Sequence, residues 1–286
     1  SSNDHDGLSP ERALRTVDYA VGLTTANVGD VIVLMTGAHS VSATIAVDVA
    51  GLTITGIPGG VPNPRAHMNA GGKTTRSTIT TTETSGIIFT VTAADTEIAY
   101  LHLTNITAGT AISVSNAADR AYIHDCTFDH TAAASATSYG INFPLGTGTT
   151  TRNDNSVIRN CFFLASDNNG PAIRGVGTVR GLSIESCTVE LAGITAWDDA
   201  IEFTLQGNQG ITIRDCDFLT QSISALMTDV IEIAGITDDN SVTILRCMFP
   251  VGSDAIEPSN VADVQVAENY LMQGAASVGG TLILST

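Results

Sequence analysis

The chain has 286 residues, of which 43% are hydrophobic and 14% charged, and its formal charge is −17 with Lys73 as the single lysine. This composition can supply a core and is not that of a disordered chain. The acidic balance argues against a nucleic-acid partner, because phosphate binding depends on Lys and Arg. No apolar run reaches the roughly 18 residues of a membrane span, so we expect no membrane partner either.

The first predicted element is a helix over about residues 9–22, within an N-terminal arm of residues 1–28. Ser9 is placed to cap this helix, and Pro10 suits its first position. Apolar residues follow at helical spacing: Leu14, Val17 and Val21. We expect the helix to cover the N-terminal end of the structure that follows, whose core and strand edges must be shielded from water.

Strands are predicted from residue 29 onward. The segments "GDVIVLM" at 29–35 and "VSATIAVDVAGLTITG" at 41–56 carry β-branched residues between Gly and Asp. A phrase built around cysteine then recurs, as "YIHDCTF" at 122–128, "VIRNCFF" at 157–163, "LSIESCTV" at 182–189, "ITIRDCDF" at 211–218 and "VTILRCMF" at 242–249. Leu101 and Asn269 take the cysteine position in one further repeat at each end.

A second, shorter phrase alternates with the first. It reads "TAISV" at 110–114, "YGINF" at 139–143, "PAIRG" at 171–175, "DAIEF" at 199–203, "DVIEI" at 229–233 and "DAIEP" at 254–258, and "GTLIL" at 280–284 ends the series. Two short strands per repeat, no helix between them and a short repeat length predict an all-β fold, a parallel β-helix. We expect about nine coils, from residue 29 to residue 286, in one domain.

The fold explains why cysteine recurs at one position. Equivalent residues of successive coils stack about 4.8 Å apart, and cysteine is a small side chain that is commonly buried. We therefore expect the five cysteines to form an interior ladder of unreactive thiols: Cys126, Cys161, Cys187, Cys216 and Cys247. The sequence "HDC" at 124–126 suggests a Cys–His–Asp site, but neighbouring strand residues point to opposite faces, so we expect none.

The opening segment resembles a known superfamily. A helix leads into "GDVIV" and "GAH", and then into "GLTITG", with nine positions that match the pattern: Gly29, Asp30, Gly37, His39, Gly51, Leu52, Thr53, Ile54 and Gly56. This pattern resembles right-handed parallel β-helix proteins of the pectate-lyase-like superfamily. Over residues 8–65 it is most similar to β-helix proteins encoded among the structural genes of tailed bacteriophages. The resemblance implies the fold, whereas the activities found on this fold are many.

The second phrase also predicts two rows of acidic side chains. Glu202, Glu232 and Glu257 form one row that faces outward, with Arg174 one coil before them, and Asp199, Asp229 and Asp254 form a parallel row at the start of each strand. Carboxylates about 5 Å apart suit a glycosidase pair, and Glu202 with Glu232 could hold calcium. A solvated acidic stripe is the third interpretation and the one we favour, so we expect no cofactor other than this calcium.

Two further features bear on partners. Trp197 is predicted to lie in a loop beside the acidic rows, where it could stack on a sugar ring. The outward row His124, Arg159, Glu185 and Arg214 is expected to hold coils together by opposite charges. The apolar end at 280–286 is expected to be covered by a neighbouring copy or by the particle.

Together these features favour a non-enzymatic virion structural protein of a tailed phage. We expect it to be a homo-oligomer on the capsid or another particle surface, with the capsid protein or other virion proteins as partners. The alternative is a tailspike-like β-helix that binds or degrades a surface glycan. A secreted or cell-surface protein of bacterial origin is a third interpretation.

Overall fold

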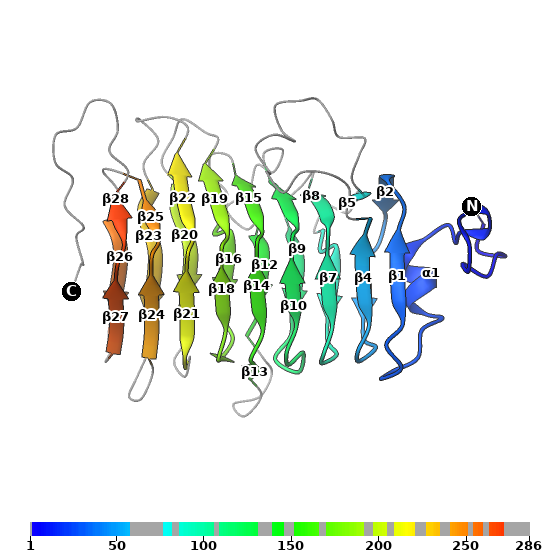
Figure 1. Cartoon of the computed structure of the whole chain (residues 1–286), viewed down its shortest axis with the longest axis horizontal. Coiled ribbons are helices and arrows are strands. Elements are labelled where there is room, and N and C mark those ends of the chain that lie inside the picture. Colours follow the sequence, from blue (N-terminus) through cyan, green and yellow to red (C-terminus); the bar gives the residue numbers. More distant parts are fainter. Residues whose placement is uncertain are drawn as a thin grey trace.

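The computed structural model describes residues 2–57, 77–81, 86–105, 109–130, 139–145, 152–165, 170–191, 197–204, 209–220, 227–234, 241–250, 254–259 and 263–271. In these residues the strands form three long sheets and one short pair, and neighbouring strands are parallel. Figure 1 shows the strands stacked side by side along one axis, with the N-terminus at one end of the stack.

Sheet 1 contains nine strands: β1 (Val31–Leu34), β4 (Thr53–Gly56), β7 (Glu97–Ala99), β10 (Tyr122–His124), β14 (Val157–Arg159), β18 (Ser183–Glu185), β21 (Ile211–Arg214), β24 (Ser241–Leu245) and β27 (Asp263–Ala267). Sheet 2 also contains nine: β2 (Gly37–Val41), β5 (Ser77–Thr81), β8 (Leu101–Asn105), β11 (Thr127–Asp129), β15 (Phe162–Ala165), β19 (Thr188–Leu191), β22 (Asp217–Thr220), β25 (Met248–Phe249) and β28 (Tyr270–Leu271).

Sheet 3 contains eight strands: β3 (Ile45–Val47), β6 (Phe89–Val91), β9 (Thr110–Val114), β12 (Tyr139–Phe143), β16 (Ile173–Gly175), β20 (Trp197–Phe203), β23 (Met227–Ala234) and β26 (Asp254–Ser259). The short pair is β13 (Asn153–Asp154) with β17 (Val179–Arg180). The chain visits sheets 1, 2 and 3 in turn and then begins the next coil. This arrangement confirms the predicted parallel β-helix.

Each of the first eight coils has three described strands, and the prediction of two per coil was wrong. The cysteine phrase holds two strands, because the residue before the cysteine position turns the chain from sheet 1 to sheet 2. At each of these corners the residue has φ between 50° and 56°: Tyr100, Asp125, Asn160, Ser186, Asp215, Arg246 and Glu268. A single left-handed residue is enough to bend a strand out of its sheet. The corner is therefore a backbone feature that the residue types do not predict.

The register confirms the interior ladders. Ile54, Ile98, Ile123, Ile158, Ile184, Ile213 and Ile244 pair in succession across sheet 1. The cysteines follow one corner later, and all five are buried with at most 2% exposure. In sheet 2, Phe128 stacks on Phe163 with ring centroids 4.5 Å apart. Apolar rows of this kind provide the core along the whole stack.

The N-terminal cap differs from the prediction. In place of one helix over 9–22, the chain forms a 3-10 turn at Pro10–Arg12 and a short helix α1 at Val17–Val21. Ala13 between them is extended, and the side chain of Thr16, not Ser9, caps α1 by accepting from the Tyr19 N–H. The Arg15 N–H donates to the Asn3 side chain instead of to a helical carbonyl. Local side-chain acceptors thus compete with the helix.

The described helices are all too short or too polar to cross a membrane. The predicted apolar end at 280–286, with "GTLIL", lies outside the described residues.

Candidate functional site

Sheet 3 carries the predicted acidic rows; Glu202 is partly exposed between buried Ile201 and Phe203, whereas Asp199 is buried. Glu202 pairs with Glu232 and Glu232 with Glu257, while Asp199, Asp229 and Asp254 pair in the same order. Arg174 pairs with Glu202, and Asn142 with Arg174. Because paired residues of neighbouring strands lie about 4.8 Å apart, the residues of each predicted row are neighbours on successive coils. The side chains of Glu257, Asp229 and Asp254 lie outside the described residues.

Arg174 is bound by its neighbours. Its Nε donates to Glu202 Oε2 over 3.2 Å, and its Nη1 donates to the Tyr139 hydroxyl over 3.1 Å. The guanidinium carbon also lies 4.9 Å from the centroid of the Tyr139 ring. Glu202 is therefore an ion-paired carboxylate, since its side chain is only 15% exposed beside a cation. Asp199, 5% exposed, and Glu232 make further interactions of their own.

One acceptor on this face is left over. Asn142 Oδ1 is buried and receives no hydrogen bond from the described residues. Arg174, on the next strand, directs its donors toward Glu202 and Tyr139 instead. A buried amide oxygen without a donor costs free energy, about 1–3 kcal/mol. A ligand hydroxyl could supply the missing donor.

The described members of the rows, Asp199, Glu202 and Glu232, do not form a metal site with other described residues. No group of three or more His, Cys, Asp and Glu side chains gathers there in a way that could hold an ion. Of the two residues named for calcium, Glu202 already pairs with the Arg174 cation. A paired guanidinium competes directly with Ca²⁺ for the same oxygens.

Trp197 was predicted to lie in a loop, and this prediction was wrong. It is the first residue of β20, where it pairs with Met227 of β23. Its side chain lies outside the described residues, so its predicted role in sugar binding stays a prediction.

The outer face of sheet 1 holds a cluster that the sequence analysis missed. His124 Nε2 lies 2.9 Å from Glu97 Oε1, and His124 Nδ1 lies 2.8 Å from Asp125 Oδ2. Imidazole donates to both carboxylates only when both nitrogens are protonated. The contact between His124 and its neighbour Asp125 arises because the chain turns at Asp125, with φ 52°. Sequence alternation alone places these two side chains on opposite faces.

Two tyrosines complete this cluster. The Tyr122 ring stacks on the His124 ring at a centroid distance of 4.2 Å, and Tyr100 meets it edge-on at 5.5 Å. The Asp125 carboxylate raises the pKa of Tyr100 above its ordinary value, because a negative charge disfavours the phenolate. Both nitrogens of His124 are occupied, and the side chain is only 10% exposed. The cluster therefore ties neighbouring coils together.

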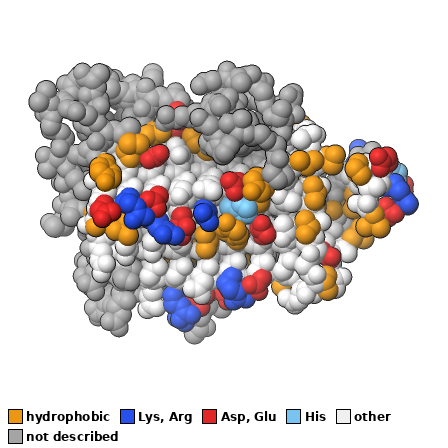
Figure 2. All heavy atoms as spheres, in the orientation of Figure 1, with side chains coloured by type: hydrophobic (Ala, Val, Ile, Leu, Met, Phe, Trp, Pro, Cys, Tyr) orange, Lys and Arg blue, Asp and Glu red, His pale blue; other side chains and the backbone are white. Residues whose placement is uncertain are grey.

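The predicted charged row continues along sheet 1 and its corners. Arg214 Nη2 lies 2.8 Å from Glu185 Oε1, and Arg246 donates two bonds of 2.7 and 2.8 Å to Asp215. Figure 2 shows charged side chains of both signs in a band along the stack. The Ser183 hydroxyl and Arg214 lower the pKa of Glu185, and Arg246 lowers that of Asp215. Glu185 and Arg214 of the predicted row thus link successive coils, and the pair Asp215–Arg246, which was not predicted, does the same.

The cysteine ladder is held by the backbone. Each thiol lies near the carbonyl of the isoleucine one coil earlier, as Cys161 Sγ lies 3.7 Å from Ile123 O and Cys187 Sγ 3.8 Å from Ile158 O. Cys126 Sγ likewise lies 3.7 Å from Ile98 O inside the coil, whereas His124 bonds outside it. No Cys–His–Asp site forms, as expected, but the expected alternation fails between His124 and Asp125, which contact each other because the chain turns at Asp125.

Comparison with known proteins supports the fold. No family model and no curated protein matches the sequence. Among solved structures, a rhamnogalacturonan lyase is similar at 11% identity and a TM-score of 0.60, over 100% of this chain and 84% of that one. The pectin methylesterase PemA from Erwinia chrysanthemi is similar at 13% identity and a TM-score of 0.58, over 98% and 91%.

A Geobacillus virus E2 protein, ORF18, is also similar, at 11% identity and a TM-score of 0.42, over 93% of this chain and 58% of that one. At identities this low, similar structure establishes a shared fold and not a shared activity. The two enzymes are parallel β-helices, and this chain has the same right-handed parallel β-helix fold.

Proposed function

We propose that the protein is a non-enzymatic structural component of a tailed-phage particle, exposed on the capsid or another particle surface. The observation that carries this proposal is the pairing of charged side chains across neighbouring coils. Among the described residues, arginine pairs with a carboxylate of a neighbouring coil at five places: Asp95–Arg120, Asp154–Arg180, Glu185–Arg214, Glu202–Arg174 and Asp215–Arg246. Glycoside cleavage instead requires two carboxyl groups free to act on one bond.

Two further points support the proposal. Residues 8–65 resemble β-helix proteins of tailed phages, and the fold itself is established by the solved structures. A rigid stack with paired charges on its faces suits a scaffold, because each coil is held by its neighbours and no part must move. We expect the protein to act as an oligomer with other virion proteins.

Glycan binding of the tailspike kind is the second candidate. The buried Asn142 Oδ1 without a hydrogen-bond donor favours it, because sugar hydroxyls are good donors. Tyr139 lies on the same strand as Asn142, β12, and Arg174 lies on the neighbouring strand β16; they offer a ring and a cation. The same fold occurs in a pectin methylesterase solved in complex with a hexasaccharide.

Polysaccharide cleavage separates the two candidates. The purified protein is incubated with pectin, alginate and rhamnogalacturonan, and new reducing ends and unsaturated products are measured. We expect no cleavage, and we expect an antibody against the chain to label virus-sized particles concentrated from the source of the sequence. Cleavage that Glu232→Gln abolishes, while the sheet 2 control Glu190→Gln retains it, would contradict the structural role.

Glycan binding without cleavage is tested separately. Asn142→Ala should weaken binding to any retained oligosaccharide if the second candidate is right, whereas Ser186→Ala, at an exposed corner between sheets 1 and 2 two coils away, should leave it unchanged. Calorimetric titration measures both. If no oligosaccharide binds the unmodified protein, the second candidate is excluded for the glycans used.

A further inference from the structure

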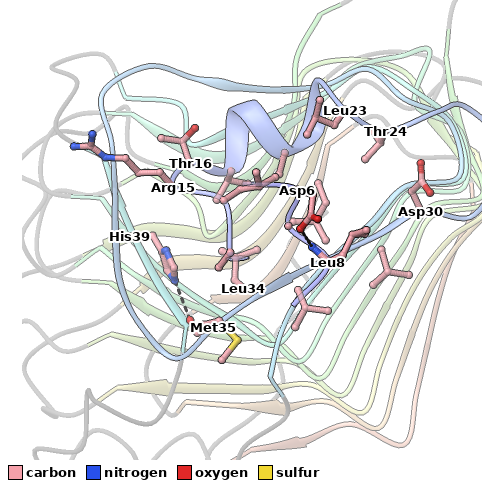
Figure 3. A pocket seen from close by; sticks show the side chains of 18 residues that line it. Asp6, Leu8, Arg15, Thr16, Leu23, Thr24, Asp30, Leu34, Met35 and His39 are labelled. Carbon is pink, nitrogen blue, oxygen red and sulfur yellow. Dashed lines mark hydrogen bonds between the residues drawn. The ribbon is translucent and has the colours of Figure 1, made fainter. Parts of the chain in front are cut away.

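A cavity opens at the N-terminal end of the stack. It lies between the arm, residues 6–16, and strand β1, and it has a volume of about 410 Å³. Figure 3 shows it from close by, with α1 above and β1 beneath. Its inner wall is apolar: Leu14, Val17, Ala20, Ile32 and Leu34. Cavities of roughly 300–1,000 Å³ with apolar walls are typical of binding sites.

One side of this cavity is an open strand edge. β1 is the first strand of sheet 1 and pairs only with β4. The Thr53 N–H donates to Asp30 O over 3.0 Å, so the backbone groups of Ile32 face β4. Those of Val31 and Val33 point the other way, since alternate residues of a strand bond to opposite sides. Within the described residues, nothing pairs with that edge.

Apolar side chains surround the open edge. Seven of the nine exposed large apolar side chains among the described residues lie between residues 8 and 35. Those that line the cavity include Leu8 at 87% exposure, Val31 at 57% and Val33 at 54%. Single exposed apolar residues are ordinary, but a gathering of them beside a free strand edge marks an interaction surface. The short α1 leaves this surface open where a longer helix could have covered it.

The charge at this end of the stack indicates what kind of segment fills the cavity. Residues 2–30 carry five acidic side chains against two arginines, which leaves three net negative charges at this end. Asp6 and Asp30 line the cavity itself, together with Arg15. A second copy of this chain, at −17, would bring further negative charge to this end, so the contacts of the expected oligomer are placed elsewhere on the molecule. The complementary occupant is a segment with basic side chains from a different protein.

We propose that the slot between the arm and β1 receives an extended segment of a partner protein, in which apolar residues alternate with Lys or Arg. The segment adds a strand to the edge of β1 through the backbone groups of Val31 and Val33, and it places apolar side chains in the cavity. The inference rests on the proposed function, because it names the end of the molecule through which the protein attaches to a particle.

Synthetic peptides test the slot directly. The probe is a fluorescent peptide of about eight alternating Val and Lys residues, a typical strand length, titrated with the full chain at low salt and followed by anisotropy. We expect saturable binding. A peptide of alternating Val and Glu, and a Val–Lys peptide with N-methylated backbone, should each bind at least about tenfold more weakly, which is about 1.4 kcal/mol.

Matched variants locate the binding on the chain. Val33→Lys places a charge on the free edge and should weaken binding at least about tenfold. Val28→Lys makes the same change at a side chain that is 63% exposed and does not line the cavity, so binding should be unchanged. Both positions are exposed, and circular dichroism with a thermal melt checks that each variant folds.

Four results would overturn the inference: no saturable binding of the Val–Lys peptide, equal binding of the acidic or methylated peptide, equal weakening by Val28→Lys, or self-association of the unmodified protein that Val33→Lys abolishes. The last result would identify a second copy as the occupant. None of these measurements depends on polysaccharide cleavage, so failure here and failure of the proposed function are distinguishable.

Discussion

At the scale of single residues, the corners between sheets 1 and 2 carry a cost in conformational free energy. Seven residues other than glycine take left-handed φ there, and an L-residue in that region costs about 1–2 kcal/mol relative to the right-handed one. Asn tolerates the conformation better than Ser, because its side chain bonds locally. The corner side chains point outward, so they can be changed without disturbing the core.

Ser186 offers the cleanest test of this cost. It has φ 53° and is exposed, and its N–H donates to Arg214 O in the next coil. Ser186→Asn should raise the free energy of unfolding by ~0.5–1 kcal/mol, whereas Ser186→Ile, which is β-branched, should lower it by a similar amount. Urea unfolding measures both. Equal stability of the two variants would show that the corner is not strained.

His130 gives a prediction about pH. It is 4% exposed, and burial lowers its pKa to about 4 from 6.5. Between these values the unfolded chain binds a proton that the folded chain does not, so stability falls as the pH is lowered from 6.5 to 4. The loss should approach about 3 kcal/mol, at 1.36 kcal/mol per pKa unit.

The control for this prediction is a neutral apolar replacement. His130→Leu should make the free energy of unfolding depend less on pH between 6.5 and 4. Well above pH 6.5 the variant and the unmodified protein should show parallel profiles, because His130 is then neutral in both the folded and the unfolded chain. Chemical unfolding at a series of pH values measures the slopes. A variant that keeps the full acid-induced loss would assign it to other groups.

At the scale of the element, the cysteine ladder and the isoleucine ladder together define the inner face of the corner. The Cys126, Cys161, Cys187, Cys216 and Cys247 thiols are each buried beside backbone carbonyls of the preceding coil. Burial raises the pKa of the Cys161 thiol above its ordinary value, because the thiolate is poorly solvated there. Thiols in this state react slowly, since the thiolate is the nucleophile.

We expect all five thiols to resist a maleimide reagent in the folded protein and to react together on unfolding. Mass spectrometry counts the labels. As a positive control, Ser186→Cys places a thiol at an exposed corner of the same stack, and it should react at once. Rapid labelling of two or more native cysteines would contradict the observed register.

At the scale of the whole molecule, two electrostatic effects oppose each other. Ion pairs such as Asp95–Arg120, with distances of 2.6 and 2.7 Å, join neighbouring coils, but exposed pairs contribute only about 0–1 kcal/mol each. The net charge of −17 repels itself over the length of the stack. Added salt weakens both the attraction and the repulsion.

We expect the repulsion to dominate, so that the melting temperature rises as sodium chloride is added from low ionic strength, by a few degrees for each 1 kcal/mol gained. Sodium sulfate is not a suitable comparison because it also strengthens apolar burial. A melting temperature that falls with sodium chloride would instead show that the coil-to-coil ion pairs outweigh the net charge.

The sequence by itself determined the repeating part of the structure. The position of Cys161 predicts the position of Cys187 because each coil repeats one pattern, and alternation within each strand decides which side chains point inward. The fold, the interior ladders and the acidic rows through Glu202 and Glu232 all follow from this local periodicity. The repeated sequence pattern therefore predicts which residues are neighbours on successive coils.

Only the tertiary structure decided the contacts that do not repeat. The third strand of each coil depends on a left-handed backbone at residues as different as Arg246 and Tyr100, which no residue type signals. His124 lies within hydrogen-bonding distance of Glu97, 27 residues away in the sequence, and Arg174 donates to Tyr139, 35 residues away, because stacking brings their coils together. The N-terminal end of the stack depends on such contacts too: the arm competes locally with its own helix, and among the described residues the edge of β1 has no paired strand.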